Sequence, residues 1–151
     1  MVAILVSIFP EYWKQIKAGK KTWEYRRIVP IQNVDKICYC LSGSGGQIVG
    51  IADVDRTIIG DPLDVRGELQ NEEGSAMDSF DDSVLLSPRP IAAFHLAYVN
   101  SVFEGQNGIK VEKVPQSFKY LDSEFIQKVN SRIIISAIEY NKNIVIELCV
   151  Q

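Results

Sequence analysis

The sequence predicts a mainly β domain with flanking helices, of the α+β class, built on a β-barrel of about five to six strands. Three observations support this prediction. A length of 151 residues with 46% apolar residues suits one domain that buries a core. Short runs of β-branched and aromatic residues recur along the chain, and Gly, Ser or Asn turns separate them. Several short strands at such spacing favour a closed or partly closed barrel.

The N-terminal part predicts a strand followed by a helix. Residues 2–8 are apolar and read as a strand, and residues 10–18 read as a helix. The proline at the start of this helix suits the first turn, where its missing N–H would have no intrahelical partner. Trp13 and Ile16 lie three residues apart and are expected to face the core. Gly19 is expected to end the helix in a left-handed conformation.

Residues 22–27 predict a second strand with two different faces. Thr22, Glu24 and Arg26 share one face, and Trp23, Tyr25 and Arg27 share the other. Residues two apart on a strand are separated by about 6.6 to 7 Å. The long side chains of Glu24 and Arg26 can therefore converge on one ligand.

The remaining elements follow from composition and period. Further strands are predicted at 36–41, 47–54, 90–103 and 109–114. The acidic segment from about 60 to 90 is expected to be a long excursion with one short helix.

The C-terminal part has two conflicting signals. Residues 123–140 have apolar residues at a helical period, although the three isoleucines at 133–135 favour a strand. We predict a helix there and a final strand at 144–150.

Charge is unevenly distributed along a chain whose net charge is −3. Between Glu11 and Arg27 there are six basic residues and two acids, whereas between Asp61 and Asp82 there are eight acids and one arginine. The first segment is therefore suited to meet anions. A protein that binds polyphosphates without selectivity is usually basic overall, so any nucleic-acid contact is expected to be local.

Cysteine and histidine usage argues against several kinds of site. Cys38 and Cys40 are expected on one face of a strand, which is not a metal or redox spacing, and we interpret them as structural thiols. His95 is the only histidine and lies in an apolar run, so we interpret it as a hydrogen-bonded residue of the barrel wall rather than a catalytic one. No metal and no cofactor are expected. The sequence shows neither a signal peptide nor a membrane span, and a cytoplasmic location is expected.

Several motifs resemble those of the ASCH domain, a branch of the PUA-like superfamily of small β-barrels. They are Ser7-Ile8-x-Pro10-Glu11-Tyr12, Gly19-x-Lys21-x-x-Glu24-x-Arg26, Val49-Gly50-x-Ala52-x-Val54 and Pro115-Gln116-Ser117-Phe118-x-Tyr120-Leu121. The resemblance implies an ASCH/PUA-like domain at 1–121, with the acidic excursion at about 60–90. Residues 122–151 are then a C-terminal extension, a helix and a strand, packed on the same domain.

The resemblance implies a cleft that receives RNA or a modified nucleobase. Its candidate ligand-binding residues are Lys21, Thr22, Glu24, Arg26, Ser117 and Tyr120. Lys21 and Arg26 would hold phosphate or carbonyl oxygens, and Glu24 would accept from a base amino group or orient the lysine. Stacking aromatics are expected among Trp23, Tyr25, Phe118 and Tyr120. Alternatively, Glu24 forms an ordinary salt bridge and the aromatics belong to the core, and Ser117 belongs to a turn.

Two other functions stay open. Some compact ASCH proteins are amidohydrolases that remove an acyl group from modified cytidine, and they have a threonine where this chain has Glu24. A hydrolase acting on a modified nucleoside or RNA would use Lys21 and Glu24 as an acid and base pair. A protein-interaction module would instead use the acidic stretch 61–82 to dock on a basic partner. The sequence predicts no oligomeric state.

Overall fold

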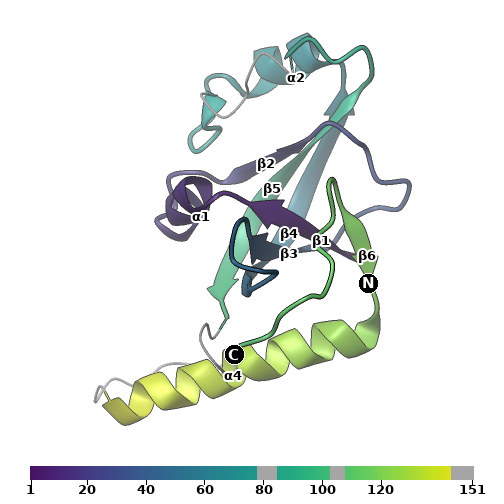
Figure 1. The fold of residues 1–151 in the computed structure, drawn as a ribbon. Helices are drawn as coiled ribbons and strands as arrows, with labels where there is room; N and C mark the ends of the chain where they lie inside the picture. The colour runs from purple at the N-terminus through teal and green to yellow at the C-terminus, as the bar shows by residue number, and fades with distance from the viewer. Residues whose placement is uncertain (78–84, 103–107, 144–151) are drawn as a thin grey trace.

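The computed structural model describes residues 1–77, 85–102 and 108–143, with side chains as far as residue 133. The elements in chain order are β1 (Ala3–Ile8), α1 (Pro10–Lys17), β2 (Trp23–Arg26), β3 (Lys36–Leu41), β4 (Ile48–Gly60), α2 (Pro62–Leu69), β5 (Ile91–Ser101), β6 (Lys119–Leu121) and α4 (Ser123–Asn143) (Figure 1). The predicted α+β class is confirmed. No helix in this described part of the chain is long and apolar enough to cross a membrane.

The strands form one mixed sheet in the order β2-β5-β4-β3-β1-β6. Strands β1 and β3 are parallel, and the other neighbours are antiparallel. Within the described residues β2 and β6 are edges, so the sheet has the predicted number of strands but is not closed into the predicted barrel. Strand β2 does approach β1, because Nη2 of Arg26 donates to the Ser7 carbonyl at 3.0 Å. The two strands are not paired, and β6 occupies this edge of β1 only at Ala3–Leu5.

Both faces of the sheet are covered. The inner cluster joins alternate residues of the strands to Trp13 and Ile16 of α1. Helix α4 covers the other face of β1 and β3 with Ile126 and Val129. Helix α2 covers the outer face of β2 and the start of β5, and Figure 1 shows α2 and α4 at opposite ends of the sheet. Strands β1, β3, β4 and β5 therefore have residues of both faces in a core.

Strand β4 is longer than the predicted 47–54, and it is irregular. Its register with β5 shifts between Asp53 and Val54 and again between Val54 and Arg56. Such bulges bend a strand and increase its twist. The bend lets Ile51 pack in the cluster beneath α4 while Ile58 packs against the cluster beneath α2. One strand thus connects the two outer cores.

The local predictions near the N-terminus are confirmed. Trp13 and Ile16 are buried, with 3% and 2% of their surfaces exposed, and Gly19 ends the helix with a φ of 73°. The predicted helix at 123–140 is also present as α4. The helical period there prevails over the strand preference of the isoleucines.

Two predictions near the C-terminus need correction. The predicted strand at 109–114 is absent, because this segment forms only an isolated bridge between Gln47 and Lys110. A strand was not predicted at Lys119–Leu121, yet these residues pair with β1 as β6. The predicted strand at 144–150 lies outside the described residues.

The two cysteines of β3 are buried thiols, as expected from their spacing. Cys38 and Cys40 both lie in the cluster beneath α4, whereas Ile37 and Tyr39 face the inner core. Burial raises the pKa of Cys38 from 9.0 to about 12, because the thiolate cannot be hydrated there. The fold therefore favours the neutral thiol.

This pKa shift predicts low reactivity and a pH-dependent stability. At pH 8, iodoacetamide is expected to leave Cys38 unmodified in the folded protein and to alkylate it in urea, as measured by peptide mass spectrometry. The raised pKa contributes stability below pH 9 that is lost as the pH rises toward 12. Alkylation of Cys38 at the rate of the unfolded chain would contradict the burial of this thiol.

Close packing at Gly50 gives a second prediction. A Cβ atom on Gly50 would lie 2.2 Å from Cη2 of Trp13 and 2.8 Å from the Asn100 carbonyl oxygen. Gly50→Ala is therefore expected to destabilise the domain by about 1–3 kcal/mol in urea unfolding. Gly67→Ala in α2 is the matched control, since a Cβ there has no atom within 4 Å. The control is expected to be neutral or stabilising by about 0.5–1 kcal/mol, and equal effects of the two variants would contradict this packing.

Candidate functional site

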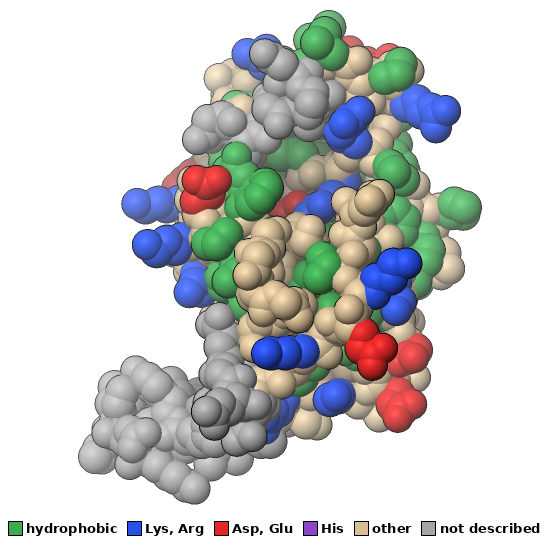
Figure 2. Space-filling model, in the orientation of Figure 1, with side chains coloured by type: hydrophobic (Ala, Val, Ile, Leu, Met, Phe, Trp, Pro, Cys, Tyr) green, Lys and Arg blue, Asp and Glu red, His purple; other side chains and the backbone are tan. Residues whose placement is uncertain are grey.

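A cavity of about 840 Å³ opens where β2 approaches the end of β1. It is lined by Ser7, Ile8, Phe9, Tyr12, Lys21, Glu24, Tyr25, Arg26, Arg27, Ile28, Ser42, Ser87, Pro88, Arg89, Gln116 and Ser117. Figure 2 shows a hollow in this face of the molecule, with acidic and basic side chains inside it. The cavity therefore occupies the gap that the unpaired edge of β2 leaves in the sheet.

Glu24 is fixed by two polar partners. Only 6% of its surface is exposed. Its Oε1 lies 2.8 Å from Nη2 of Arg26, and its Oε2 accepts a hydrogen bond from the Tyr39 hydroxyl at 3.2 Å. Burial, with a further contribution from the charge of Glu24, raises the pKa of Tyr39 well above its usual value. Tyr39 thus stays a donor, and the carboxylate keeps one orientation.

Arg26 connects the two strands that border the cavity. The same Nη2 atom contacts both Glu24 and the Ser7 carbonyl, at 2.8 and 3.0 Å. Its Nε is buried and has no hydrogen-bond partner in the described part of the chain. Because its charge is already paired, Arg26 is well suited to orient Glu24.

Lys21 is the second buried charge at the cavity, with 4% of its surface exposed. Its ammonium donates to the Trp23 carbonyl and lies 5.0 Å from the centre of the Tyr25 ring. The Tyr25 hydroxyl in turn donates to the Ser75 carbonyl at 2.5 Å. Burial, followed by the charges of Glu72 and Glu24, raises the pKa of Tyr25. The residues after α2 thereby hold one wall of the cavity.

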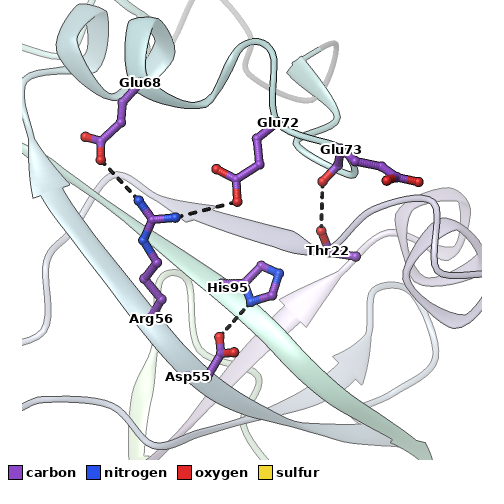
Figure 3. Close-up of polar contacts among 7 residues, drawn as sticks. All are labelled: Thr22, Asp55, Arg56, Glu68, Glu72, Glu73 and His95. Carbon is purple, nitrogen blue, oxygen red and sulfur yellow. Dashed lines mark hydrogen bonds and ion pairs between the residues drawn. The ribbon is translucent and has the colours of Figure 1, made fainter.

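The structure brings four of the six candidate residues together. Lys21, Glu24, Arg26 and Ser117 line the cavity, whereas Thr22 and Tyr120 do not. The backbone N–H of Thr22 donates to Gly74, and its hydroxyl points at the Glu73 carbonyl (Figure 3). The Tyr120 hydroxyl accepts from the Gln32 N–H at 3.1 Å. The chain bends at Gln116 and Ser117 before it enters β6, as the turn interpretation expects.

The aromatic residues are arranged differently from the prediction. Trp23 is fully buried beneath α2, and Phe118 packs against the inner core. Of the four candidates only Tyr25 lines the cavity, together with Phe9 and Tyr12, which the sequence analysis did not single out. The Phe9 and Tyr12 ring centroids are 6.3 Å apart, and 58% of Phe9 is exposed. A ligand ring can reach Phe9 but not Trp23.

The only histidine lies on the outer face of the sheet. Its Nδ1 is 2.6 Å from Oδ1 of Asp55, and its ring centroid is 5.0 Å from that of Trp23. It does not line the cavity. These contacts agree with the interpretation of His95 as a hydrogen-bonded residue of the sheet wall.

The acidic excursion is tied to this outer face. Arg56 of β4 pairs with Glu68 at 3.2 Å and with Glu72 at 3.6 Å (Figure 3). Exposed pairs of this kind contribute little stability one by one. They do neutralise part of the acidic stretch internally.

No group of three or more metal-ligating side chains occurs among the residues that the structure describes. In the part of the chain that the structure describes, the charged groups that line the cavity are four cations, Lys21, Arg26, Arg27 and Arg89, and one carboxylate, Glu24. Such a set is suited to bind an organic ligand or an anion. Arg89 was not predicted from the sequence, because it lies two residues before β5 and the pairing of β5 with β2 is not visible from local sequence.

Solved structures with this fold include the ASCH protein from Zymomonas mobilis. This chain superposes on it with a TM-score of 0.67 and 22% sequence identity, over 85% of this chain and 94% of the other. Two variants of that protein, one Tyr→Phe and one Ser→Ala, give TM-scores of 0.67 and 0.68 at the same identity. No family model and no curated protein sequence matches the chain. The resemblance to ASCH domains, first indicated by the motifs, is thus confirmed at the level of the fold.

Proposed function

We propose that this chain is an ASCH-type domain that binds RNA or a nucleotide-sized ligand in the cavity beside Lys21, Glu24 and Arg26. The observation that carries the proposal is that the three charged side chains of the motif line one cavity of about 840 Å³. Ligand pockets commonly have volumes of about 300–1,000 Å³. The fold shared with ASCH proteins supports the same reading.

The buried polar groups of the cavity, Glu24 and Lys21, are suited to bind the polar edge of a base. A carboxylate has about four lone-pair sites, so Glu24 can accept from a base amino group while it keeps Arg26 and Tyr39. The ammonium of Lys21 has three donors and can share one with a carbonyl or phosphate oxygen. Phe9 and Tyr12 offer ring faces for stacking at the cavity wall.

A hydrolase is the alternative use of the same residues. As a general base, Glu24 would take up a proton and so weaken its ion pair with Arg26. The Glu24 contacts therefore favour binding over acid-base catalysis. The threonine of the acylases that the motif resembles is replaced by Glu24, so we do not propose acylase chemistry.

A binding assay with matched variants tests the proposal. We expect wild-type protein to bind at least one member of a panel of nucleosides, nucleoside monophosphates and short single-stranded RNAs. Lys21→Ala is expected to weaken this binding at least tenfold, since a hydrogen bond to a charged group contributes about 1.5–3 kcal/mol. Lys14→Ala is the control, because Lys14 is exposed on α1 outside the cavity.

The outcomes of this assay separate the alternatives. Equal affinities of the Lys21 variant and the wild type would contradict the proposed site. Turnover of a bound modified nucleoside or RNA that disappears in Glu24→Gln would establish the hydrolase instead. Isothermal titration calorimetry and chromatography of the incubated ligand provide the two measurements.

A further inference from the structure

We propose that the cavity selects ligands that carry a phosphate group, and that Arg89, with Arg27, makes this selection. This inference rests on the proposed function and adds the class of ligand and a specificity-determining residue. Arg89 lies outside the motif, in the segment that leads from the acidic excursion into β5.

The charges at the cavity give the first argument. Among the described residues four cations and one carboxylate line it, which gives a net charge of +3 in a chain whose total is −3. Glu24 and Arg26 pair with each other and cancel. Arg27 and Arg89 form no ion pair with an acidic side chain of the described residues. A neutral nucleoside would leave these charges uncompensated, whereas a phosphate group would offset them.

The sheet explains why Arg89 reaches the motif. Strands β2 and β5 are antiparallel, with Arg26 opposite Ala92. Arg89 precedes Ala92 by three residues, so it enters the sheet at the end where Arg27 leaves it. The pairing of β2 with β5 thus brings Arg27 and Arg89, which are 62 positions apart in the sequence, to the same cavity.

The backbone at Arg89 is held in place locally. Pro88 and Pro90 flank it, and each fixes its own φ near −65°. The Ser87 hydroxyl donates to the Arg89 carbonyl at 3.1 Å and accepts from the Arg89 N–H at 3.4 Å. The guanidinium is therefore presented from a short, constrained turn.

Arg27 and Arg89 differ from the two arginines that lie within strands, Arg26 and Arg56. Arg26 is paired with Glu24, and Arg56 with Glu68 and Glu72. Among the described residues no acidic side chain forms an ion pair with Arg27 or Arg89, and both are exposed. A guanidinium presents paired donors that match two phosphate oxygens. These two arginines thus have the chemistry to bind phosphate at the mouth of the cavity.

Matched ligands test this selection. The affinities of one nucleoside, its 5′-monophosphate and a short single-stranded RNA of the same base are measured for the wild type, Arg89→Ala and Arg27→Ala. Arg66→Ala is the control, because Arg66 is exposed on α2 outside the cavity. Circular dichroism checks that all variants are folded.

We expect the wild type to bind a phosphorylated ligand at least tenfold more tightly than the nucleoside. Arg89→Ala is expected to remove about tenfold of that preference and to leave the nucleoside affinity unchanged. For the RNA, the plot of the logarithm of the association constant against the logarithm of salt concentration is expected to become less steep. Its slope should decrease in magnitude by about 0.7 for each lost phosphate contact. Preference for the monophosphate indicates a terminal phosphate, and preference for the RNA alone indicates the backbone.

Two results would overturn the inference in different ways. Equal affinity for nucleoside and phosphorylated ligands, or an Arg89→Ala variant that behaves as Arg66→Ala does, would refute phosphate selection. The proposed function would survive that result if Lys21→Ala still abolished nucleoside binding. Absence of binding by any ligand to the wild type would refute both.

Discussion

Replacement of Trp23 by alanine is expected to destabilise the domain by about 3–5 kcal/mol, the range typical of deleting a large buried aromatic side chain. Trp23 has no exposed surface and packs with Val65 and Leu69 of α2. The guanidinium of Arg56 lies 5.5 Å from the centre of its ring. The cavity left by the substitution would lie directly beneath α2. Urea unfolding followed by circular dichroism measures the loss.

A control substitution in α2 itself tests whether the loss of stability comes from the burial of Trp23 or from any change at this helix. Leu63 is also large and apolar, but 69% of its surface is exposed. Leu63→Ala is therefore expected to change the free energy of unfolding by no more than about 0.5 kcal/mol. A Trp23→Ala variant as stable as Leu63→Ala would show that α2 does not depend on this side chain.

Replacement of Glu24 by alanine is expected to destabilise the domain by about 3 kcal/mol and to abolish ligand binding. The substitution leaves the charge of Arg26 without its carboxylate and the fully buried Tyr39 hydroxyl without its acceptor. Removal of one partner from a buried ion pair typically costs about 3–5 kcal/mol. We expect the lower end because Arg26 borders an open cavity, whose water can solvate it.

Glu24→Gln tests which part of this effect comes from charge. The amide oxygen can still accept from Tyr39, but the ion pair with Arg26 is lost. The stability of this variant should lie between those of the wild type and Glu24→Ala. Wild-type stability of Glu24→Ala would mean that the polar contacts at the cavity do not hold the fold together.

Trp23→Ala and Glu24→Ala change neighbouring residues that face opposite sides of β2. Trp23 joins the outer core beneath α2, and Glu24 faces the cavity. Strand alternation alone separates the residue that packs against the helix from the residue that faces the cavity. The alternation of Trp23 and Glu24 is predicted correctly from the sequence, since it depends only on local period.

Local signals also predict α1 and its end. The proline at its start, the spacing of Trp13 and Ile16, and the left-handed Gly19 each act within a few residues. The convergence of Glu24 and Arg26 is local in the same sense, and they lie 2.8 Å apart. Such features can be read from one segment without knowledge of its partners.

The failures arise where distant segments meet. Barrel closure depends on which strand occupies the free edge of β1, and β6 is only three residues long. Thr22 was predicted to share the face of Glu24 and Arg26. Its N–H instead donates to the Gly74 carbonyl, and Thr22 does not line the cavity. Arg89 enters the site through the pairing of β5 with β2. None of these long-range contacts can be predicted from the sequence of one short segment.

The central claim is that the cavity beside Lys21, Glu24 and Arg26 is where the ligand binds. Amide chemical shifts of ¹⁵N-labelled protein, measured by NMR during titration with the tightest ligand of the panel, locate binding directly. We expect the largest changes at residues 7–12, 21–28, 87–89 and 116–117, which contain most of the cavity lining. Changes confined to the outer face around Asp55, Arg56 and His95, with none at the cavity, would contradict the account.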